Sequence, residues 1–513
     1  LSAALNASSF GVQVSVPPGR TVLSQTLEIH LAGNKALSLR GAGSDVTELV
    51  WTAPVDGLTV SFDDAATNSR DAFASGGKFS FEGISLVSGV PFVQLRTSAS
   101  TPSGNILRFS STSGVSVGMF VTSFVDAANI TLGTFVAAVT DGTVHLSANV
   151  TGPVEAGGEL SFVRVAGSAL TINGDSNQQF GLESPELYIR DTSIHGFTGG
   201  SLFTPGGSWL NGIVCNNQTE IRIDSAFVTF GRELPVGVGL TIRGSYPTRL
   251  ADDHHITNLR TIAGEIGILL GDGHPGFEGL MISDSSLVGP SRYGIWANTD
   301  HSIEDQLTVT GTHINAGHAA LAVDGMTQVS VSNCFFIVGG GVGGDVAAIN
   351  FTDVGWYALT GNLFQMMDLQ KSERSVWGIV VDNAEHWGDK TWGGTISGNV
   401  IQEPSSGGIW LKNFANNVLV SGNMITTAGQ PARVDSTTAA THFIGNMANG
   451  KIWDHPDPSL GTLLSVERPT SFRDMQGTGS LPETSANDGS VSLQTFCAPS
   501  WLAKPAADIS TCL

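Results

Sequence analysis

The chain has 513 residues, a net charge of −21 and only 24 lysines and arginines, which argues against a nucleic-acid partner because phosphate binding needs clustered basic side chains. The same charge argues against an anionic membrane surface and suits a neutral substrate better than a polyanion. Since 41% of the residues are hydrophobic and 13% charged, the chain is not disordered, and no apolar run approaches the roughly 20 residues that span a bilayer.

Glycine, serine, threonine, valine, isoleucine and asparagine are numerous, which favours a β-protein with many turns. The first segment, 1–91, contains "VSVPPGRTVLSQTLEI" from Val14 and "ALSLRGAGSDVTELVW" from Ala36, two strand-like stretches around a Pro-Pro-Gly turn. We expect this segment to hold an N-terminal cap and the first coils of a repetitive fold.

The next segment, 92–165, has closely spaced strand patterns such as "NILRFSSTSGVSVGMFV" but lacks the later repeat. It predicts a small β-rich insertion. Two interpretations stay open for it, a module that contacts carbohydrate or other subunits and an insertion without a function of its own.

From 166 to 452 one pattern recurs at steps of 24 to 30 residues: a glycine or alanine, several apolar residues, then a polar residue. Examples are "GIVCN" at Gly212, "GIWANTD" at Gly294 and "GIVVD" at Gly378. A second strand pattern follows each one, and in the last repeats it contains Gly-Asn, as at Asn362 and Asn399. A period of this length without helical patterning predicts a solenoid whose stacked repeats share one core. An asparagine at a fixed corner can adopt the left-handed conformation and hydrogen-bond to the same amide one coil away.

The repeats and the N-terminal segment resemble the right-handed parallel β-helix of the pectin-lyase-like superfamily, in its pectate-lyase-3 and tailspike-like branch. The resemblance implies an all-β solenoid with an internal asparagine ladder. It leaves the reaction open, because the superfamily contains hydrolases, lyases, epimerases, fructan transferases, tailspikes and adhesins. It also implies a secreted, periplasmic, cell-surface or virion-associated protein, and a homotrimer as one oligomeric state.

Carboxylates end the first strands of five successive repeats, namely Asp272, Asp300, Asp324, Asp353 and Asp382. Neighbouring coils lie about 4.8 Å apart, so these acids are expected to form one column along an edge of the solenoid. Glycosidases hold two carboxyl groups about 5–5.5 Å apart when retaining and about 6.5–9.5 Å apart when inverting. The predicted catalytic residues are therefore Asp324, Asp353, Asp382, Asp300 and Glu385. The competing interpretation is that aspartates at strand ends cap turns.

The loops at the same corner carry candidate substrate contacts. Tryptophan can stack on sugar faces, and loop carboxylates, histidine and arginine can line a cleft. The predicted substrate-binding residues are His386, Trp387, Trp392, Trp356, Arg374, Glu373 and Asp272. Buried core tryptophans and solvated charged loops are the alternatives.

The last segment, 453–513, is rich in proline, serine and threonine and is expected to cap the solenoid. Its Cys497 and Cys512 could form a disulfide, whereas Cys215 and Cys334 are expected to be buried thiols. We expect no cofactor and no protein-bound metal; a Ca²⁺ ion held by the acidic column is the alternative.

The sequence thus favours a glycoside hydrolase that acts on a polysaccharide or oligosaccharide with paired carboxylates. The alternatives are a polysaccharide lyase, Ca²⁺-assisted if basic residues are too few, a fructan transferase, and a non-catalytic tailspike-like or adhesin-like solenoid that binds carbohydrate.

Overall fold

The computed structural model describes residues 11–32, 35–63, 78–90, 92–123, 129–131, 133–174, 186–196, 207–218, 220–230, 236–244, 251–252, 254–271, 277–299, 305–339, 346–367, 375–383, 392–413, 415–435, 438, 440–449 and 451–453. All of them belong to the first of two units, residues 1–470. Nearly all the regular structure in the described residues consists of β-strands, most of them paired in parallel.

Sheet B supplies one strand to every coil. In the described part of the chain it contains 12 parallel strands, which stack in chain order. They are β3 (Leu27–Ala32), β6 (Leu58–Asp63), β15 (Val165–Asn173), β17 (Ser208–Asn216), β19 (Val238–Arg243), β23 (Ile266–Leu270), β27 (Tyr293–Asn298), β30 (Ala319–Asp324), β33 (Val346–Thr352), β36 (Val376–Asn383), β39 (Gly407–Asn413) and β42 (Gln430–Val434).

Sheet A completes each coil with two short strands in succession, which we call its first row and second row. The first row comprises β1 (Gly11–Ser15), β4 (Ala36–Arg40), β7 (Lys78–Glu82), the starts of β16 (Glu186–His195) and β18 (Ile221–Thr229), β21 (His255–Thr257), β25 (Leu280–Ser283), β28 (Gln306–Thr310), β31 (Gln328–Ser332), β34 (Trp356–Thr360), β37 (Gly394–Ser397), β40 (Val418–Ser421) and β43 (His442–Ile444).

The second row comprises β2 (Gly19–Leu23), β5 (Thr47–Trp51), β8 (Ser85–Ser88), the ends of β16 and β18, β22 (Arg260–Ile262), β26 (Ser286–Val288), β29 (His313–Ala316), β32 (Phe335–Val338), β35 (Leu363–Met366), β38 (Val400–Gln402), β41 (Met424–Thr426) and β44 (Asn446–Ala448). One antiparallel strand, β45 (Lys451–Trp453), pairs with β44. Two two-residue strands, β20 (Ala251–Asp252) and β24 (Phe277–Glu278), pair separately.

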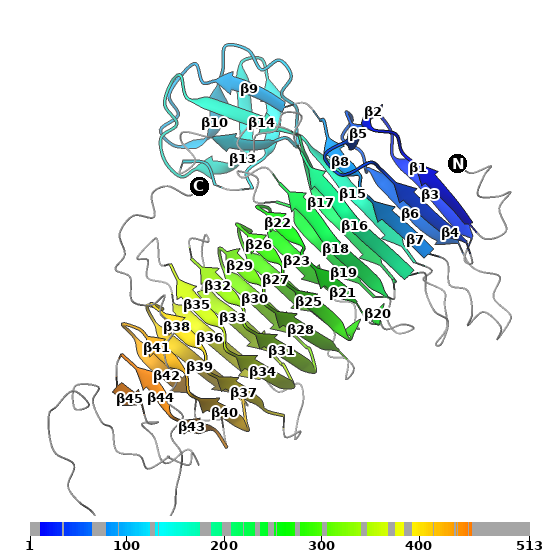
Figure 1. The fold of residues 1–513 in the computed structure, drawn as a ribbon. Helices are drawn as coiled ribbons and strands as arrows, with labels where there is room; N and C mark the ends of the chain where they lie inside the picture. The colour runs from blue at the N-terminus through cyan, green and yellow to red at the C-terminus, as the bar shows by residue number, and fades with distance from the viewer. Residues whose placement is uncertain are drawn as a thin grey trace, which may run out of the picture. The chain divides into compact units, whose positions relative to one another are not determined.

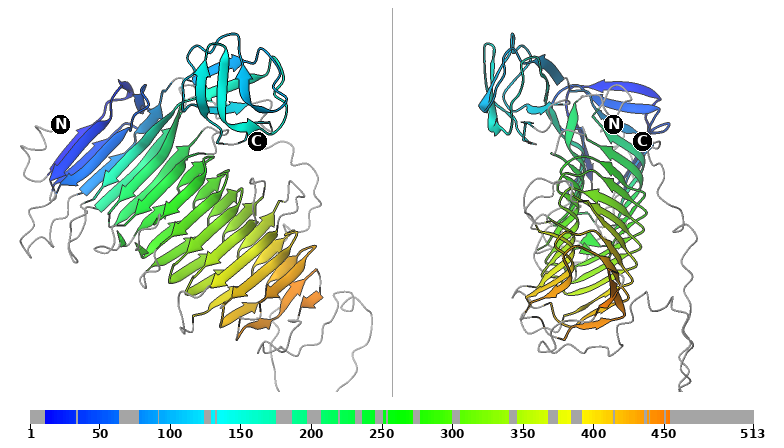
Figure 2. Two further views of the ribbon diagram at one scale, coloured as in Figure 1. Left: turned by 180° about the vertical axis from the view of Figure 1, so that it is seen from behind. Right: turned by 90° about the vertical axis from the view of Figure 1, so that its left-hand side faces the viewer.

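Figure 1 shows the coils stacked in chain order, and the views from behind and from the side in Figure 2 show the same succession. The protein is therefore a right-handed parallel β-helix, and the predicted fold class is confirmed.

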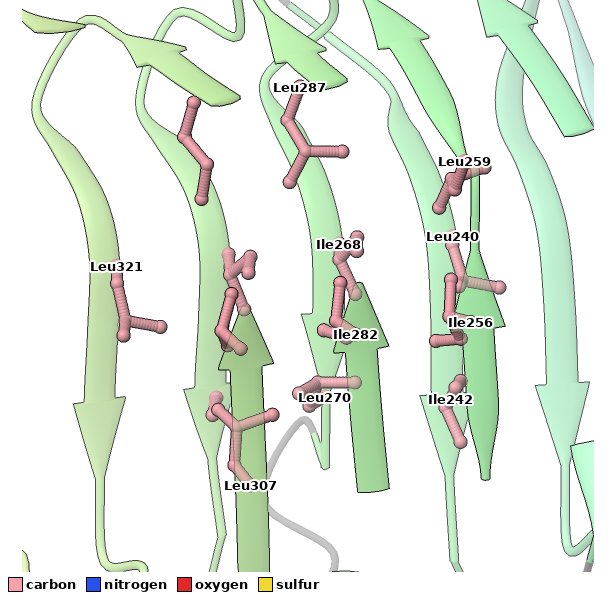
Figure 3. Packing of buried hydrophobic residues seen from close by; sticks show 14 of the residues in the cluster. Leu240, Ile242, Ile256, Leu259, Ile268, Leu270, Ile282, Leu287, Leu307 and Leu321 are labelled. Carbon is pink, nitrogen blue, oxygen red and sulfur yellow. The ribbon is translucent and has the colours of Figure 1, made fainter. Parts of the chain in front are cut away.

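Sheet A and sheet B enclose one apolar core. Inward side chains of both sheets belong to a single buried cluster. Figure 3 shows Ile256 and Ile282 of the first row beside Leu240, Ile268 and Leu270 of sheet B. Because alternate residues of a strand point to opposite faces, the remaining positions form outward columns that run along the helix axis.

The repeated glycine has a steric cause. A Cβ on Gly267 would lie 2.5 Å from the carbonyl oxygen of Gly294, and one on Gly294 would lie 2.6 Å from that of Ala320. These distances are shorter than van der Waals contact, so the position accepts residues with little or no side chain.

The asparagine ladder is confirmed. The Nδ2 of Asn362 donates to Oδ1 of Asn399 at 3.0 Å, Asn399 donates to Asn423 at 2.9 Å, and Asn423 donates to Asn446 at 2.9 Å. Each of these side chains is at most 1% exposed. One detail of the prediction is wrong: the residue in the left-handed region is the preceding glycine, such as Gly398 with φ 64°, and not the asparagine of the ladder.

Residues between Phe92 and Val163 form a module of antiparallel strands. One sheet contains β10 (Gly104–Arg108), β13 (Thr143–Val150) and β12 (Val136–Thr140), and the other contains β11 (Phe120–Ser123), β14 (Glu159–Val163) and β9 (Phe92–Arg96). The module has its own buried cluster, in which the rings of Phe109 and Phe162 meet edge to face at 5.6 Å.

The two described cysteines, Cys215 and Cys334, are free and buried, as expected. Burial raises the pKa of the Cys334 thiol to about 11, so it stays protonated. Cys497 and Cys512 lie outside the described residues. In the described part of the chain, no helix has the length and apolar character needed to cross a membrane.

Candidate functional site

Asp324 and Asp382 lie in one outward column at the end of the sheet B strands. Asp324 pairs with Thr352, and Thr352 pairs with Asp382 in the next coil. The two aspartates are therefore two coils apart, about 9.6 Å between backbone positions at a strand spacing of about 4.8 Å. The carboxyl groups of inverting glycosidases lie about 6.5–9.5 Å apart, so this backbone spacing is of the same order.

The expected column of five acids is wrong in its register. Asp353 follows Thr352, so it lies one position beyond the column in which Asp324 and Asp382 stand. It occupies the left-handed region with φ 50° and is only 8% exposed. The chain turns at this residue, and the turn removes Asp353 from the outward row. Asp272 and Asp300, the other expected members, lie outside the described residues.

Asp382 is held by its neighbours on the following coil. Lys412 Nζ lies 3.1 Å from Asp382 Oδ2, and the amide of Asn413 donates to Oδ1. Lys412 also lies 4.4 Å from the ring centre of Trp410. The carboxylate of Asp382 is thus fixed in place, with a cation beside it.

The outer face of sheet B carries aromatic side chains whose faces are already in contact with the protein. The ring of Trp410 contacts Lys412 and also Arg433, whose Cζ lies 4.3 Å from the ring centre. The Nε1 of Trp410 donates a hydrogen bond to Asp435 at 3.1 Å. Trp377 is 5% exposed and packs on Trp410 at 5.1 Å between ring centres. These rings stabilise the last coils and offer little free surface to a sugar.

A groove of about 470 Å³ lies on the first row of sheet A. Trp356, in the third of the five successive coils that line the groove, is 50% exposed, and its ring centre lies 5.8 Å from that of Trp392, edge to face. The described residues that line it are Gln306, Leu307, Thr308, Gln328, Val329, Ser330, Trp356, Tyr357, Ala358, Gly393, Gly394, Thr395, Asn417 and Leu419.

The strand register arranges these side chains in rows. One row along the axis is Gln306, Gln328 and Trp356, in three successive coils. Beside it, a second row forms the floor and consists of Thr308, Ser330, Ala358, Thr395 and Leu419. Amide or hydroxyl groups thus occur in four of the five coils that line the groove, on either side of the coil with the exposed indole, and successive coils lie about 4.8 Å apart.

The ring of Tyr357 lies under the groove at Gly394, where a Cβ would collide with it. Tyr357 is buried, and burial raises the pKa of its hydroxyl well above the ordinary value, so the phenol stays neutral. The absence of a side chain at Gly394 leaves room for this ring beneath the sheet.

The groove and the acid column lie on different sheets, separated by a short turn: β30 ends at Asp324, and β31, which lines the groove, begins at Gln328. Trp356 and Trp392, which were predicted to contact substrate, lie in or beside the groove. Asp324, Asp353 and Asp382 are not among its described lining residues. The structure therefore does not bring the predicted tryptophans and acids into one described cleft.

Five further predicted site residues lie outside the described residues: Glu373, Arg374, Glu385, His386 and Trp387. Sequence reasoning missed the amides and hydroxyls of the groove. The available signal was the polar position of the second strand pattern, which is uncharged in five successive repeats, as in "QLTVT" and "QVSVS". Among the described side chains, no three histidines, cysteines or acids gather as a metal site requires.

No model of a protein family matches the chain, and no curated protein matches it. Among solved structures, it is similar to the tailspike protein gp49 from Pseudomonas phage LKA1, with a TM-score of 0.30 and 12% identity over 88% of this chain and 74% of that one. It is also similar to a mannuronic acid specific polysaccharide family 6 lyase from human gut microbiota, with a TM-score of 0.35 and 10% identity over 87% and 79%.

A third similar structure is the complex of XylC with xylose, with a TM-score of 0.32 and 11% identity over 81% of this chain and 71% of that one. At these identities the likeness extends no further than the kind of fold, which the strand pairing establishes by itself. The described strands form a right-handed parallel β-helix, and the predicted resemblance is confirmed at the level of fold.

Proposed function

We propose that this protein binds a polysaccharide in the groove on the first row of sheet A. The observation that carries the proposal is Trp356, half exposed in the middle coil of a groove whose described polar groups are mainly amides and hydroxyls. An indole face packs on the C–H face of a sugar ring, and amides and hydroxyls exchange hydrogen bonds with sugar hydroxyls. A secreted, cell-surface or virion-associated location suits such a partner.

Replacing Trp356 tests this function. Trp356→Ala removes the exposed indole, and we expect about 2 kcal/mol of binding free energy to be lost, an affinity about 30-fold lower. Affinity electrophoresis in gels containing polysaccharide, followed by calorimetry on the polysaccharides that retard the protein, measures it. Leu210→Ala is the control, because Leu210 is 44% exposed on β17, outside the groove. Equal retardation of Trp356→Ala and the unmodified protein contradicts the proposal.

Hydrolysis is a second candidate function, favoured by the spacing of Asp324 and Asp382. In this proposal Asp324 is the general acid that protonates the glycosidic oxygen. Asp382, whose Oδ2 lies 3.1 Å from Lys412 Nζ, activates water as the general base, with inversion at the anomeric carbon. A lyase would instead release an unsaturated sugar, which absorbs ultraviolet light.

The second candidate predicts that Asp324→Asn lowers the release of reducing ends by about 10²–10⁴-fold while leaving the free energy of unfolding within about 0.5 kcal/mol of the parent. Asp141→Asn, in an exposed turn of the small module, is the matched control. Full activity of Asp324→Asn excludes this role, and no activity of the unmodified protein on any polysaccharide leaves binding as the function.

A further inference from the structure

We infer that the ligand of the sheet A groove is an uncharged polysaccharide whose chain runs parallel to the helix axis. The inference rests on the proposed function and deepens it by naming the substrate class and its direction. It is drawn from a change of chemistry along one face of the solenoid.

At the last outward position of each first-row strand, the side chain is charged in early coils of the protein and carries a hydroxyl in later ones. In the early coils it carries residues of alternating sign, namely Arg40, Glu82, Arg190 and Asp224, in neighbouring strands. Arg40 Nε lies 3.8 Å from Glu82, and Arg190 Nε lies 3.8 Å from Asp224.

After β18 the same position carries a hydroxyl in seven successive coils. These residues are Thr257, Ser283, Thr310, Ser332, Thr360, Ser397 and Ser421. Two pairs of them hydrogen-bond to each other: Ser332 donates to Thr310 at 3.2 Å, and the hydroxyls of Thr360 and Ser397 lie 3.4 Å apart.

The groove lies beside this hydroxyl row, in the same strands. The described residues that line it are uncharged, in a protein whose net charge is −21. A polyanion would meet a negative overall potential and no described basic side chain in the groove to form charge-assisted hydrogen bonds. A neutral polyhydroxyl chain meets no such repulsion and can hydrogen-bond to every coil.

The direction of the bound polysaccharide follows from the repetition of the coils along the helix axis. Successive coils lie about 4.8 Å apart along the axis, so the five coils that line the groove span about 19 Å and the seven hydroxyls beside it about 29 Å. Across the strands the groove is limited to two outward rows, the one with Gln306, Gln328 and Trp356 and the floor row. A linear polymer therefore makes repeated contacts only if it lies along the axis.

The test compares uncharged and anionic polysaccharides on the full chain. The probes are dextran, galactomannan and xyloglucan on one side and polygalacturonate and alginate on the other, at 50 and 500 mM NaCl. We expect at least one neutral polysaccharide to bind at least tenfold more tightly than either polyanion, with less than a twofold change between the two salt concentrations. Tighter binding of a polyanion, or no binding of any probe, overturns the inference.

A pair of variants locates the binding on this face. Thr308→Val combined with Thr395→Val removes two floor hydroxyls at similar volume and should weaken binding at least fivefold. The control is Thr59→Val combined with Thr171→Val, an adjacent pair on the outer face of sheet B. Equal effects of the two double variants overturn the assignment to the groove.

The outcomes also separate the two proposals. If Trp356→Ala abolishes binding of a polyanion, the proposed function stands and the inference about neutral substrates fails. If Trp356→Ala leaves glycan binding intact but changes the mass of the protein in light scattering, the groove contacts a second copy of the chain and both fail.

Discussion

At the scale of single residues, the most informative side chains are those whose chemistry conflicts with their surroundings. Trp356 is large, aromatic and half exposed, and it lies where polar groups converge. Tyr357, the next residue, points inward and packs edge to face on Phe351 at 5.7 Å. Alternation along a strand therefore assigns one aromatic ring to the surface and its neighbour to the core.

His254 is another such residue and predicts a pH dependence of stability. It is fully buried, and its Nδ1 accepts a hydrogen bond from the backbone N–H of Ile221 at 3.1 Å. Burial, together with the neighbouring His255, lowers the pKa of His254 to about 3. The folded protein keeps this imidazole neutral, whereas the unfolded chain protonates it near its ordinary pKa.

Because the folded pKa of His254 is depressed, the unfolded state binds more protons below about pH 6.5, and acid favours unfolding. The contribution of the neutral His254 to the free energy of unfolding is complete above about pH 6.5. It declines as the pH falls towards 3, by at most about 1.4 kcal/mol per pH unit. We expect His254→Gln to reduce this slope. Urea unfolding at pH 7.5, 6, 5 and 4 measures it, and parallel pH profiles of the two proteins contradict the assignment.

At the scale of elements, the asparagine ladder holds the bend between the two rows of sheet A. Asn399 Oδ1 accepts from both the backbone N–H and the Nδ2 of Asn362, each at 3.0 Å. Its own Nδ2 donates to the carbonyl of Leu359 at 2.9 Å and to Asn423 at 2.9 Å. One side chain thus connects three consecutive coils.

Asn399→Ala is expected to lower the free energy of unfolding by about 3 kcal/mol or more, since buried donors and an acceptor lose their partners. Asn315→Ala, at a part-buried position on β29, should change it by less than about 1 kcal/mol. Chemical denaturation followed by circular dichroism compares the two. A loss at Asn399 no larger than at Asn315 would show that the ladder contributes little to stability.

The turn between β33 and β34 separates two aspartates that look equivalent in the sequence. The sequence places an aspartate at the end of each of two successive strand patterns, Asp324 and Asp353, and suggests that they are equivalent. They are not, because Asp353 adopts a positive φ and is buried at the turn. A shift of one residue changes the direction of a side chain, and repeat spacing alone does not reveal it.

At the scale of the whole molecule, stacking converts sequence periodicity into continuous columns, each with one chemical character over several coils. The outer face of the first row is charged in its early coils and hydroxyl-rich in its later ones. Sheet B carries Asp324 and Asp382 and also Trp410, whose ring contacts Lys412 and Arg433. The two faces therefore differ in chemistry, and our two proposals assign binding of an uncharged chain to the first row and an acid–base pair to sheet B.

The sequence by itself determined the coil. The glycine positions, the alternating apolar residues and the Gly-Asn pairs predict the strands, the bend and the ladder, because each of these depends on local backbone geometry and on an identical neighbour one period away. Only the tertiary structure decided which side chains meet. The register between coils places Trp356 beside Gln328 and not beside Asp324, and the direction of one turn keeps Asp353 from facing outward. Residues about 28 positions apart become neighbours only through that register.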